Sequence, residues 1–504
     1  MTSPAAELRY LVRRRRPALV AVTLGAPLFV FLTLARGGLR AAELLLAVIL
    51  AAAFVLAVAR RPATAFIALL VWQPFSVLAL ASLYRLGAPG RIVHYLGSVR
   101  DFVVIGIVIA AVLNPRRRRL DTLDKLALAL ILVISAYLVI PYLAPGLLAG
   151  TTLNVRGLAW RNDVEFLVLF VALRHAPIPV DALRKTTYAV LGVAAVVAAG
   201  ALIEFFASST WNTFLVSTLR VQAYKNQVLH AHVNPTDALV HGVVGSHAII
   251  RVGSVLLSPL TLGFNLYLAW ALSLRLLSGR RPKPWALVAA GLVATGILVT
   301  LTRSAVLGAL VVALASVLLA SARQSRGRVR VGLLLLSAAV LFAPLAGSTT
   351  LGQRTSEAAQ GSDVSANAHL TSLRSGVETI AHYPLGRGLG TQPGIGSRFG
   401  VNGTVTAEDY YLGLGDEVGV VSAVLFVAVV VFLLVGLRRR ARAPGAVGSF
   451  AGAVWAAGVG LAVGALFLHI WLDVALSLSF WGVAALAMSD PWADLRTDSM
   501  RHAA

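Results

Sequence analysis

The stretch LGLGDEVGVVSAVLFVAVVVFLLVGLRRRAR, residues 412–442, decides the fold class of this chain. Residues 412–435 are mostly apolar, and four arginines follow within residues 438–442. A helix needs roughly 20 mostly apolar residues to cross the hydrocarbon core of a bilayer. Basic residues at one end of such a run set its orientation. The stretch therefore predicts a membrane-spanning helix whose arginine end faces the cytoplasm.

The same alternation of apolar runs and arginine clusters continues along all 504 residues. Hydrophobic residues make up 58% of the chain and charged residues only 13%, with a mean hydropathy of +0.81. These values exclude an ordinary soluble domain and predict an all-α polytopic membrane protein with about 12–14 transmembrane helices. The candidate spans cover residues 18–35, 41–59, 63–80, 101–113, 123–143, 163–174, 187–206, 256–277, 285–301, 304–320, 331–347, 412–435, 448–468 and 470–488.

The net charge of +23 supports an orientation for these spans. In a soluble protein such a charge would suggest nucleic-acid binding, but here 29 of the 44 Lys and Arg residues fall in segments assigned to the cytoplasm and 15 outside. This bias follows the positive-inside rule, so we expect no nucleic-acid partner. The first span follows RRRR at residues 13–16 without a convincing cleavage site, and we interpret it as a retained span.

The predicted topology divides the chain into five parts, with both termini in the cytoplasm. They are N-terminal transmembrane helices (1–206), a first extracytoplasmic loop (207–255), central transmembrane helices (256–346), a large extracytoplasmic loop (347–411), and C-terminal transmembrane helices with a cytoplasmic tail (412–504).

Four arginines on the outer side are not explained by the orientation rule: Arg251, Arg303, Arg374 and Arg387. An arginine in the hydrocarbon region costs about 2.5–3.5 kcal/mol unless it reaches the interface or an anion. Each of them taken singly fits an interfacial arginine. Four on one side, flanked by Gly, Ser and Thr, favour an anion site, since guanidinium groups bind phosphate through paired hydrogen bonds.

The stretch ETIAHYPLGRGLGTQPGIGS, Glu378–Ser397, adds a glycine-rich loop to the larger outer segment. Gly386, Gly388 and Gly390 carry no side chain, so a backbone or a ligand can approach closely there. His382 stands before the loop, where it fits either a phosphate contact or a turn cap. The loop lacks the Gly-Lys-Ser/Thr ending of a nucleotide-binding P-loop, and an ordinary surface loop remains an alternative.

Several short motifs resemble those of the O-antigen ligase and polysaccharide polymerase superfamily of bacterial membrane glycosyltransferases. They occur in the family's order, within residues 150–488. They are RVGSVLLSPLTLG (Arg251–Gly263), TLTRSAVLG (Thr300–Gly308), HYPLGRGLG (His382–Gly390) and EDYYLGLGDEVGVVS (Glu408–Ser422).

The resemblance implies transfer of a glycan from a polyprenyl diphosphate carrier, such as undecaprenyl diphosphate, to an acceptor hydroxyl. The reaction would take place at the outer face of a bacterial plasma membrane and contribute to the cell envelope. The partners would be the lipid-linked glycan, a glycan or glycolipid acceptor and membrane lipid. Arg251 and Arg303 match the positions of the family's diphosphate-binding arginines, with Arg374 and Arg387 as second choices.

Glu408 and Asp409 depart from the family pattern, in which a histidine is followed by Asn, Ser or Gln. The spacing to Gly419 and Ser422 is kept. A glutamate that is partly screened from water can act as a general base, so Glu408 and Asp409 are the catalytic candidates. An inactive relative, or a solvated loop end before a span, are the alternatives.

No cofactor is expected, because fixed arginines can stabilise the charge that develops on the diphosphate. The chain has no cysteine and hence no thiolate ligand. The first outer loop contains His230, His232, His241 and His247, but their spacing fits no standard metal site. We therefore expect a metal-independent enzyme.

A transporter or flippase for a lipid-linked or anionic solute is the alternative function. Many spans and outer arginines are compatible with it. The two halves of the sequence lack the internal repeat that is usual in such folds. A cell-wall glycan polymerase of the shape-and-division type, with related chemistry, is a third and weaker alternative.

The topology predicts opposite accessibility for two engineered cysteines, Ser362→Cys and Ser325→Cys. In intact cells an impermeant thiol reagent should label position 362 and leave position 325 unlabelled, because only the first lies in an outer loop. The native chain offers no background thiol. Labelling of both positions from one side would refute the topology.

Overall fold

A computed structural model describes residues 48–114, 119–144, 146–148, 151–179, 181–229, 241–244, 247–278, 284–321, 364–396, 399, 401 and 408–489. The predicted spans 18–35 and 331–347, the test positions Ser325 and Ser362, and His230 and His232 lie outside these residues. The chain divides into two units, Met1–Arg60 and Arg61–Ala504. Of the first unit, the structure describes the apolar helix Val48–Arg60.

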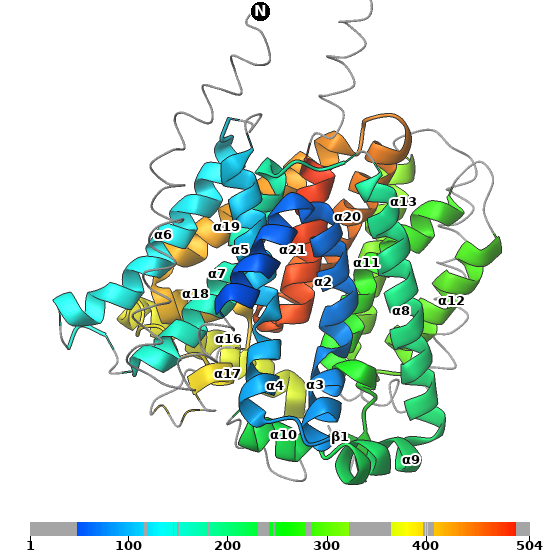
Figure 1. Ribbon diagram of the computed structural model, residues 1–504, viewed down its shortest axis with the longest axis horizontal. Coiled ribbons are helices and arrows are strands. Elements are labelled where there is room, and N and C mark those ends of the chain that lie inside the picture. The colour runs from blue at the N-terminus through cyan, green and yellow to red at the C-terminus, as the bar shows by residue number, and fades with distance from the viewer. Residues whose placement is uncertain are drawn as a thin grey trace, which may run out of the picture. The chain divides into compact units, whose positions relative to one another are not determined.

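The second unit is built from helices, so the predicted all-α fold is confirmed (Figure 1). A short antiparallel hairpin, β1 (His241–Val244) with β2 (His247–Ile250), is the exception in the part described, and it pairs His241 with Ile250. The helices are α2 (Pro62–Trp72), η1 (Gln73–Phe75), α3 (Ser76–Arg85), α4 (Gly90–Gly97), α5 (Val99–Leu113), α6 (Thr122–Leu143), α7 (Leu153–His175), α8 (Ala182–Phe206), α9 (Ser208–Thr213), η2 (Phe214–Thr218), α10 (Val221–Gln227), η4 (Ser254–Leu256), α11 (Pro259–Leu277), α12 (Pro284–Leu298), α13 (Arg303–Ser321), α16 (Val364–His382), α17 (Pro393–Gly396), α18 (Tyr410–Val418), α19 (Val420–Arg440), α20 (Gly445–Gly464), η6 (Ile470–Leu472) and α21 (Val474–Met488).

Seven helical segments within the described residues are long and apolar enough to cross a membrane. They are Pro62–Arg85, Gly90–Leu113, Thr122–Leu143, Ala182–Phe206, Pro259–Leu277, Val420–Arg440 and Gly445–Gly464. Four shorter apolar helices accompany them: Val48–Arg60, Pro284–Leu298, Arg303–Leu319 and Val474–Met488. The chain is therefore a multi-pass membrane protein, as its composition predicts.

Side chains that accept hydrogen bonds from the first helical turn explain where several helices begin. Asp121, Thr152, Ser258, Asp409 and Asp473 are such N-caps, of α6, α7, α11, α18 and α21. A cap satisfies one of the backbone N–H groups that a helix start leaves free. These positions hold Asp, Ser or Thr, the residue types that best supply the accepting oxygen.

One predicted span is interrupted at Gly419. The sequence predicts a single helix over residues 412–435, whereas the structure has the short helix α18 and then α19. Gly419 has φ +84°, which only glycine adopts at little cost. The break separates the end of α18 from the membrane-spanning helix, and it was not predicted because the apolar pattern runs on past it.

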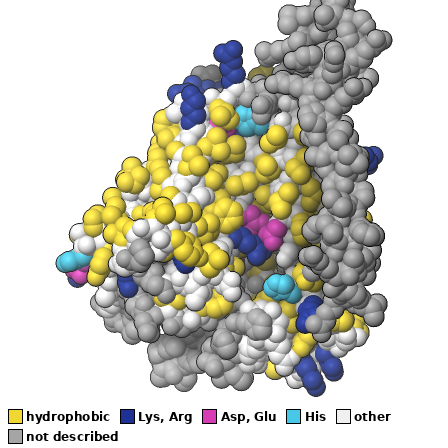
Figure 2. All heavy atoms as spheres, turned by 60° about the vertical axis from the view of Figure 1, so that its left-hand side comes forward, with side chains coloured by type: hydrophobic (Ala, Val, Ile, Leu, Met, Phe, Trp, Pro, Cys, Tyr) yellow, Lys and Arg dark blue, Asp and Glu magenta, His cyan; other side chains and the backbone are white. Residues whose placement is uncertain are grey.

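Two helices, α5 and α7, extend beyond the predicted spans 101–113 and 163–174, and their charged residues pair with each other; α7 is not among the segments named above as long and apolar enough to cross a membrane. Arg100 and Asp101 lie in α5, while Arg161 and Glu165 lie in α7. The Nε atom of Arg161 is 3.0 Å from Asp101, and Arg100 is 3.5 Å from Glu165. Figure 2 shows acidic and basic side chains gathered within a largely hydrophobic face of the molecule. Such pairing offsets part of the cost of charge in a membrane.

The centre of the second unit is α21, which contacts α2, α7, α8, α11, α19 and α20 (Figure 1). Nearly every side chain of α21 is buried. Glycines of α20 allow close approach: a Cβ atom at Gly460 would lie 2.4 Å from Val312, and one at Gly464 would lie 2.7 Å from Phe264. Small residues permit this packing between membrane helices, where lipid tails are as apolar as leucine.

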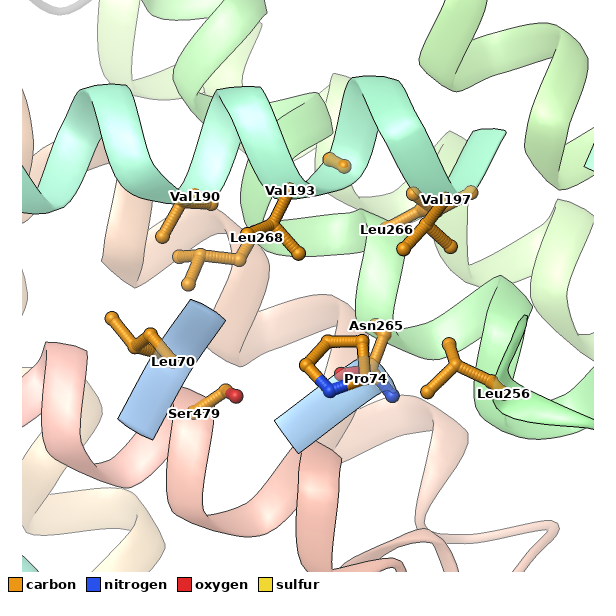
Figure 3. A pocket seen from close by; sticks show the side chains of 11 residues that line it. Leu70, Pro74, Val190, Val193, Val197, Leu256, Asn265, Leu266, Leu268 and Ser479 are labelled. Atoms are coloured by element: carbon orange, nitrogen blue, oxygen red, sulfur yellow. The ribbon is translucent and has the colours of Figure 1, made fainter. Parts of the chain in front are cut away.

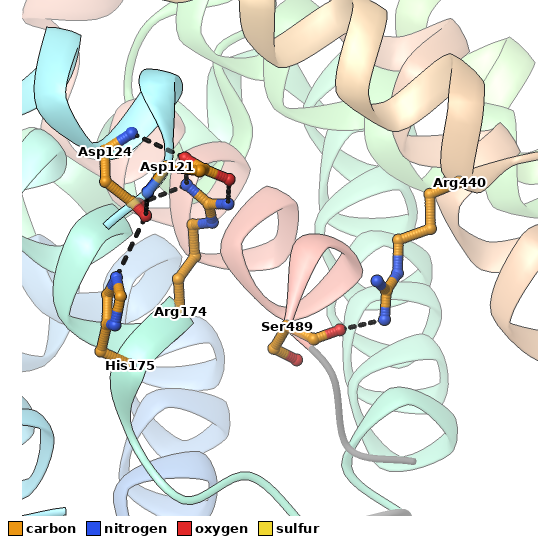
Figure 4. A network of polar contacts seen from close by, with 6 residues as sticks. All are labelled: Asp121, Asp124, Arg174, His175, Arg440 and Ser489. Atoms are coloured by element: carbon orange, nitrogen blue, oxygen red, sulfur yellow. Dashed lines mark hydrogen bonds and ion pairs between the residues drawn. The ribbon is translucent and has the colours of Figure 1, made fainter. Parts of the chain in front are cut away.

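A buried ion-pair network ties the start of α6 to the end of α7 (Figure 4). Arg174 pairs with Asp124 and, at 2.7 Å, with Asp121, and His175 lies 3.2 Å from Asp124. Removing one partner of a buried pair leaves an uncompensated charge. The network therefore fixes how α6 and α7 meet. The helix α7 also contacts α5 and α21, and its Asp163 accepts a hydrogen bond from Tyr410 of α18.

Candidate active site

Two of the predicted arginine segments meet in the structure. Arg251 lies in the loop before η4, and its Nη2 atom donates a hydrogen bond to Thr302 Oγ1. Thr302 is buried and directly precedes Arg303, the first residue of α13. The two motifs that carry Arg251 and Arg303, which stand about 50 residues apart in the chain, therefore form one site.

The turn before Arg303 has an unusual backbone. Leu301 has φ +51°, a left-handed conformation that costs a leucine roughly 1–2 kcal/mol. Thr300 and Thr302 stabilise the turn, because Thr300 Oγ1 accepts from Thr302 N at 3.2 Å and Thr302 Oγ1 donates to Thr300 O at 3.2 Å. The threonines of TLTRS thus hold the turn that begins α13.

The glycine-rich loop packs on the chain's own backbone. Arg387 N donates to Asp416 O at 2.7 Å, Gly388 N donates to Glu417 O at 2.9 Å, and Gly390 N donates to the Glu417 carboxylate. A Cβ atom at Gly386 would lie 2.4 Å from Gly419 N. The close approach that the glycines allow is therefore to α18 and to the break after it.

Buried carboxyl groups surround the contact between this loop and α18. Glu417 on α18 and Asp163 on α7 are both about 1% exposed, and Tyr410 donates a hydrogen bond to Asp163 Oδ1 at 3.2 Å. The Tyr410 ring packs against Phe426 with centroids 4.9 Å apart. These contacts hold α18 against α7 and α19.

Glu408 has a histidine partner. Its carboxylate lies against Nδ1 of His369 on α16, and its backbone N–H donates to Ser372 Oγ at 2.7 Å. The two side chains are 41% and 31% exposed, so solvent reaches both. A carboxylate and an imidazole in contact can exchange a proton, which is the arrangement that general acid–base chemistry uses.

Asp409 lies in a different environment from its neighbour. Its side chain is buried and accepts from Leu412 N at 2.7 Å as the N-cap of α18. Burial raises the pKa of Asp409, while the backbone N–H groups oppose the shift. The two adjacent acids are thus distinct: Glu408 is accessible and paired with a histidine, whereas Asp409 supports a helix start.

His469 is a third titratable group close to Glu408. Burial lowers the pKa of His469, and the backbone oxygen and the carboxylate of Glu408 oppose this shift. His369 drew no attention in the sequence because an amphipathic helix gives no signal for a single histidine.

The segment His469–Asp473 links the two halves of the candidate site. The short helix η6 within it contacts both α18, which follows Glu408, and α11, which follows Arg251. Asp473 Oδ2 also accepts from Thr261 Oγ1 of α11 at 2.5 Å. The helices that follow Arg251 and Glu408 in the sequence therefore both contact this one short segment.

The remaining predicted residues lie near the glycine-rich loop. Arg387 stacks over the Tyr383 ring, 5.9 Å from its centroid, and Arg374 is exposed on α16. The Nδ1 atom of His382 lies 2.7 Å from Glu378 O, so this histidine closes the end of α16. Among the residues described, no group of three His, Asp or Glu side chains is arranged to hold a metal ion.

Comparison with known proteins gives one match to a family. Residues 288–426 match the model of the O-antigen ligase family. This confirms the predicted resemblance to the O-antigen ligase superfamily and supports a glycan-transferring membrane enzyme. A search of curated proteins gave no match.

The residues that match the family model contain most of the candidate site described above. They include Arg303, the glycine-rich loop and Glu408, together with His369. Arg251 and His469 lie outside the matched residues but contact them, through Thr302 and Glu408 respectively. The candidate site thus combines the matched residues with segments on both sides of them in the sequence.

Gly386→Ala should destabilise the protein more than Gly87→Ala. Both glycines have positive φ, +76° and +94°, so each alanine meets a similar backbone strain of about 1–2 kcal/mol. A Cβ atom at Gly386 would in addition overlap Gly419 and Glu417, whereas Gly87 has no atom within 4 Å. Thermal unfolding in detergent measures the difference. Equal losses in the two variants would contradict the close backbone contact.

Proposed function

We propose that this protein transfers or polymerises a glycan from a polyprenyl diphosphate carrier onto an acceptor hydroxyl. The reaction takes place at the extracytoplasmic face of a bacterial plasma membrane. The match of residues 288–426 to the O-antigen ligase family carries the proposal. The meeting of Arg251 with the turn before Arg303, and of Glu408 with His369, supports it.

Arg251 and Arg303 bind the diphosphate in this mechanism. As the glycosidic bond breaks, negative charge grows on the diphosphate leaving group, and fixed guanidinium groups stabilise it. Thr302 holds Arg251 beside Arg303 through the hydrogen bond to its hydroxyl. Arg387 and Arg374 are further candidates, of which Arg387 lies at the glycine-rich loop.

Glu408 removes the proton from the acceptor hydroxyl as it attacks the anomeric carbon. His369, in contact with the carboxylate, orients Glu408 and passes the proton to solvent. Together the two residues take the place of the family's single histidine. Asp409 contributes indirectly, because it caps the helix that follows Glu408.

Arg303→Lys should lose transferase activity nearly as fully as Arg303→Ala. Lysine keeps the charge but cannot form the two-pronged phosphate contact of a guanidinium group. Arg275→Lys is the control and should keep its activity, because Arg275 bonds Ser449 from the last turn of α11, at the other end of that helix from Arg251. An Arg303→Lys variant with near-native turnover would contradict a paired contact to phosphate.

Glu408→Gln should bind the lipid-linked donor normally while turnover falls by about 10²-fold or more, the usual effect of losing a general base. Glu378→Gln on α16 is the matched control, and its turnover should not change. Steady-state kinetics with purified protein separate the two effects. Unchanged turnover in Glu408→Gln would remove Glu408 as the base.

Transferase activity should survive EDTA, since arginines are proposed to hold the diphosphate without a bound cation. The measurement compares turnover before and after chelation and after a divalent ion is restored. Loss on chelation with recovery on metal addition would refute metal independence.

Reconstitution with a lipid-linked oligosaccharide tests the function itself. Purified protein in liposomes should form new glycosidic bonds between donor and acceptor. Movement of the lipid across the bilayer without new bonds would instead establish a flippase.

A further inference from the structure

The loop that carries Arg251 has an unfavourable backbone conformation, so contacts from other segments must stabilise it. Ser254 has φ +52° and Leu257 has φ +57°, both left-handed and unfavourable for residues with a side chain. Gly253 is crowded as well, since a Cβ atom there would lie 2.6 Å from Ser258 N. Strained backbone of this kind persists only where surrounding contacts fix it.

Glu204, near the end of α8, supplies the strongest of these contacts. One of its carboxylate oxygens, Oε2, accepts from Gly253 N at 3.1 Å and from Ser254 N at 2.5 Å. Its residue is 5% exposed, so these bonds form away from water. A buried carboxylate needs hydrogen-bond donors, and here the donors are the backbone immediately after Arg251 and Val252.

Two more positions on α8 serve the same loop. Ser254 Oγ donates to Val197 O at 2.8 Å. A Cβ atom at Gly200 would lie 2.8 Å from that Ser254 oxygen, so the glycine leaves room for the loop. Residues 197, 200 and 204 are spaced three and four apart and share one face of the helix. This face of α8 therefore forms a platform for the loop.

Below the platform the loop borders a mostly apolar cavity. Val197 of α8 and Leu256 of η4 line it, together with Pro74 of η1 and Leu266 of α11 (Figure 3). Such walls offer few polar partners to the backbone of the loop. The hydrogen bonds from Gly253 and Ser254 to Glu204 are therefore polar restraints that this apolar wall does not replace.

We propose that Glu204 is a positioning residue for Arg251: by holding the Gly253–Ser254 backbone, it keeps the Arg251 guanidinium beside Thr302 and Arg303 for the donor diphosphate. The inference rests on the proposed function for the role of Arg251. Glu204 itself touches no reacting atom. Its loss releases the loop and weakens donor binding, while the base at Glu408 stays in place.

The reactivity of an engineered cysteine measures how exposed the loop is, without any activity assay. Val252 is 3% exposed, and the chain has no other cysteine. In detergent, Val252→Cys should react slowly with a maleimide. Adding Glu204→Leu should raise the labelling rate by about 10-fold or more, since two hydrogen bonds to a carboxylate are lost. Adding Glu204→Gln should change it little, because the amide oxygen still accepts both bonds.

Kinetics in the otherwise native protein give the second measurement. Glu204→Leu should raise the KM for the lipid-linked donor by about 10-fold or more with a smaller change in kcat, and Glu204→Gln should restore most of it. A purely structural role would lower the amount of folded protein for both variants without this pattern. Asp181→Asn, in an exposed ion pair with Lys185 at the opposite end of α8, is the control and should leave KM unchanged.

The outcomes separate this inference from the proposed function. Slow labelling of Val252→Cys with Glu204→Leu present, or an unchanged donor KM, overturns the positioning role. If the native protein makes no glycosidic bond but Glu204→Leu still exposes position 252, the proposed function fails and the structural part stands. If Glu204→Leu does not fold, Ser254→Ala removes the bond to Val197 alone, and unchanged labelling in that variant likewise overturns the platform.

Discussion

The close backbone contact between Gly386 and Gly419 is the constraint on which the candidate site depends. It lets the glycine-rich loop pair with the last residues of α18, and that pairing fixes where α18 ends and α19 begins. Tyr410 and Glu417 then lock α18 against α7. Glu408, which directly precedes this locked segment, is held by His369 and Ser372 on α16.

Composition and charge were sufficient to predict the fold class, because a bilayer admits few alternatives to apolar helices. Helix bounds were harder to predict where charges pair inside the protein: α5 and α7, which hold Arg100 and Glu165, extend beyond the apolar runs of the sequence. The division at Gly419 was missed for the opposite reason. One left-handed glycine interrupts an apolar pattern that hydropathy treats as continuous.

The site was predicted in part. Motif order placed Arg251 and Arg303 together, and the hydrogen bond to Thr302 agrees with that placement. His369 and Glu204 were not recognised as members of the site, because they lie on other helices and the sequence around them contains no motif that marks them as partners. The roles of these residues in catalysis stay predictions. Glu408 and Asp409 looked equivalent in the sequence, and only burial distinguishes them.

The glycine-rich loop also has a consequence for how such a protein can diversify. Its residues Arg387 and Gly388 donate backbone hydrogen bonds to α18, but Tyr383 and Leu385 at its tip are 55% and 58% exposed. Substitutions at this tip would alter the outer surface of the loop without disturbing the hydrogen bonds beneath it. A rigid inner edge with an exposed tip would let that surface vary between related proteins while the frame of the loop stays the same.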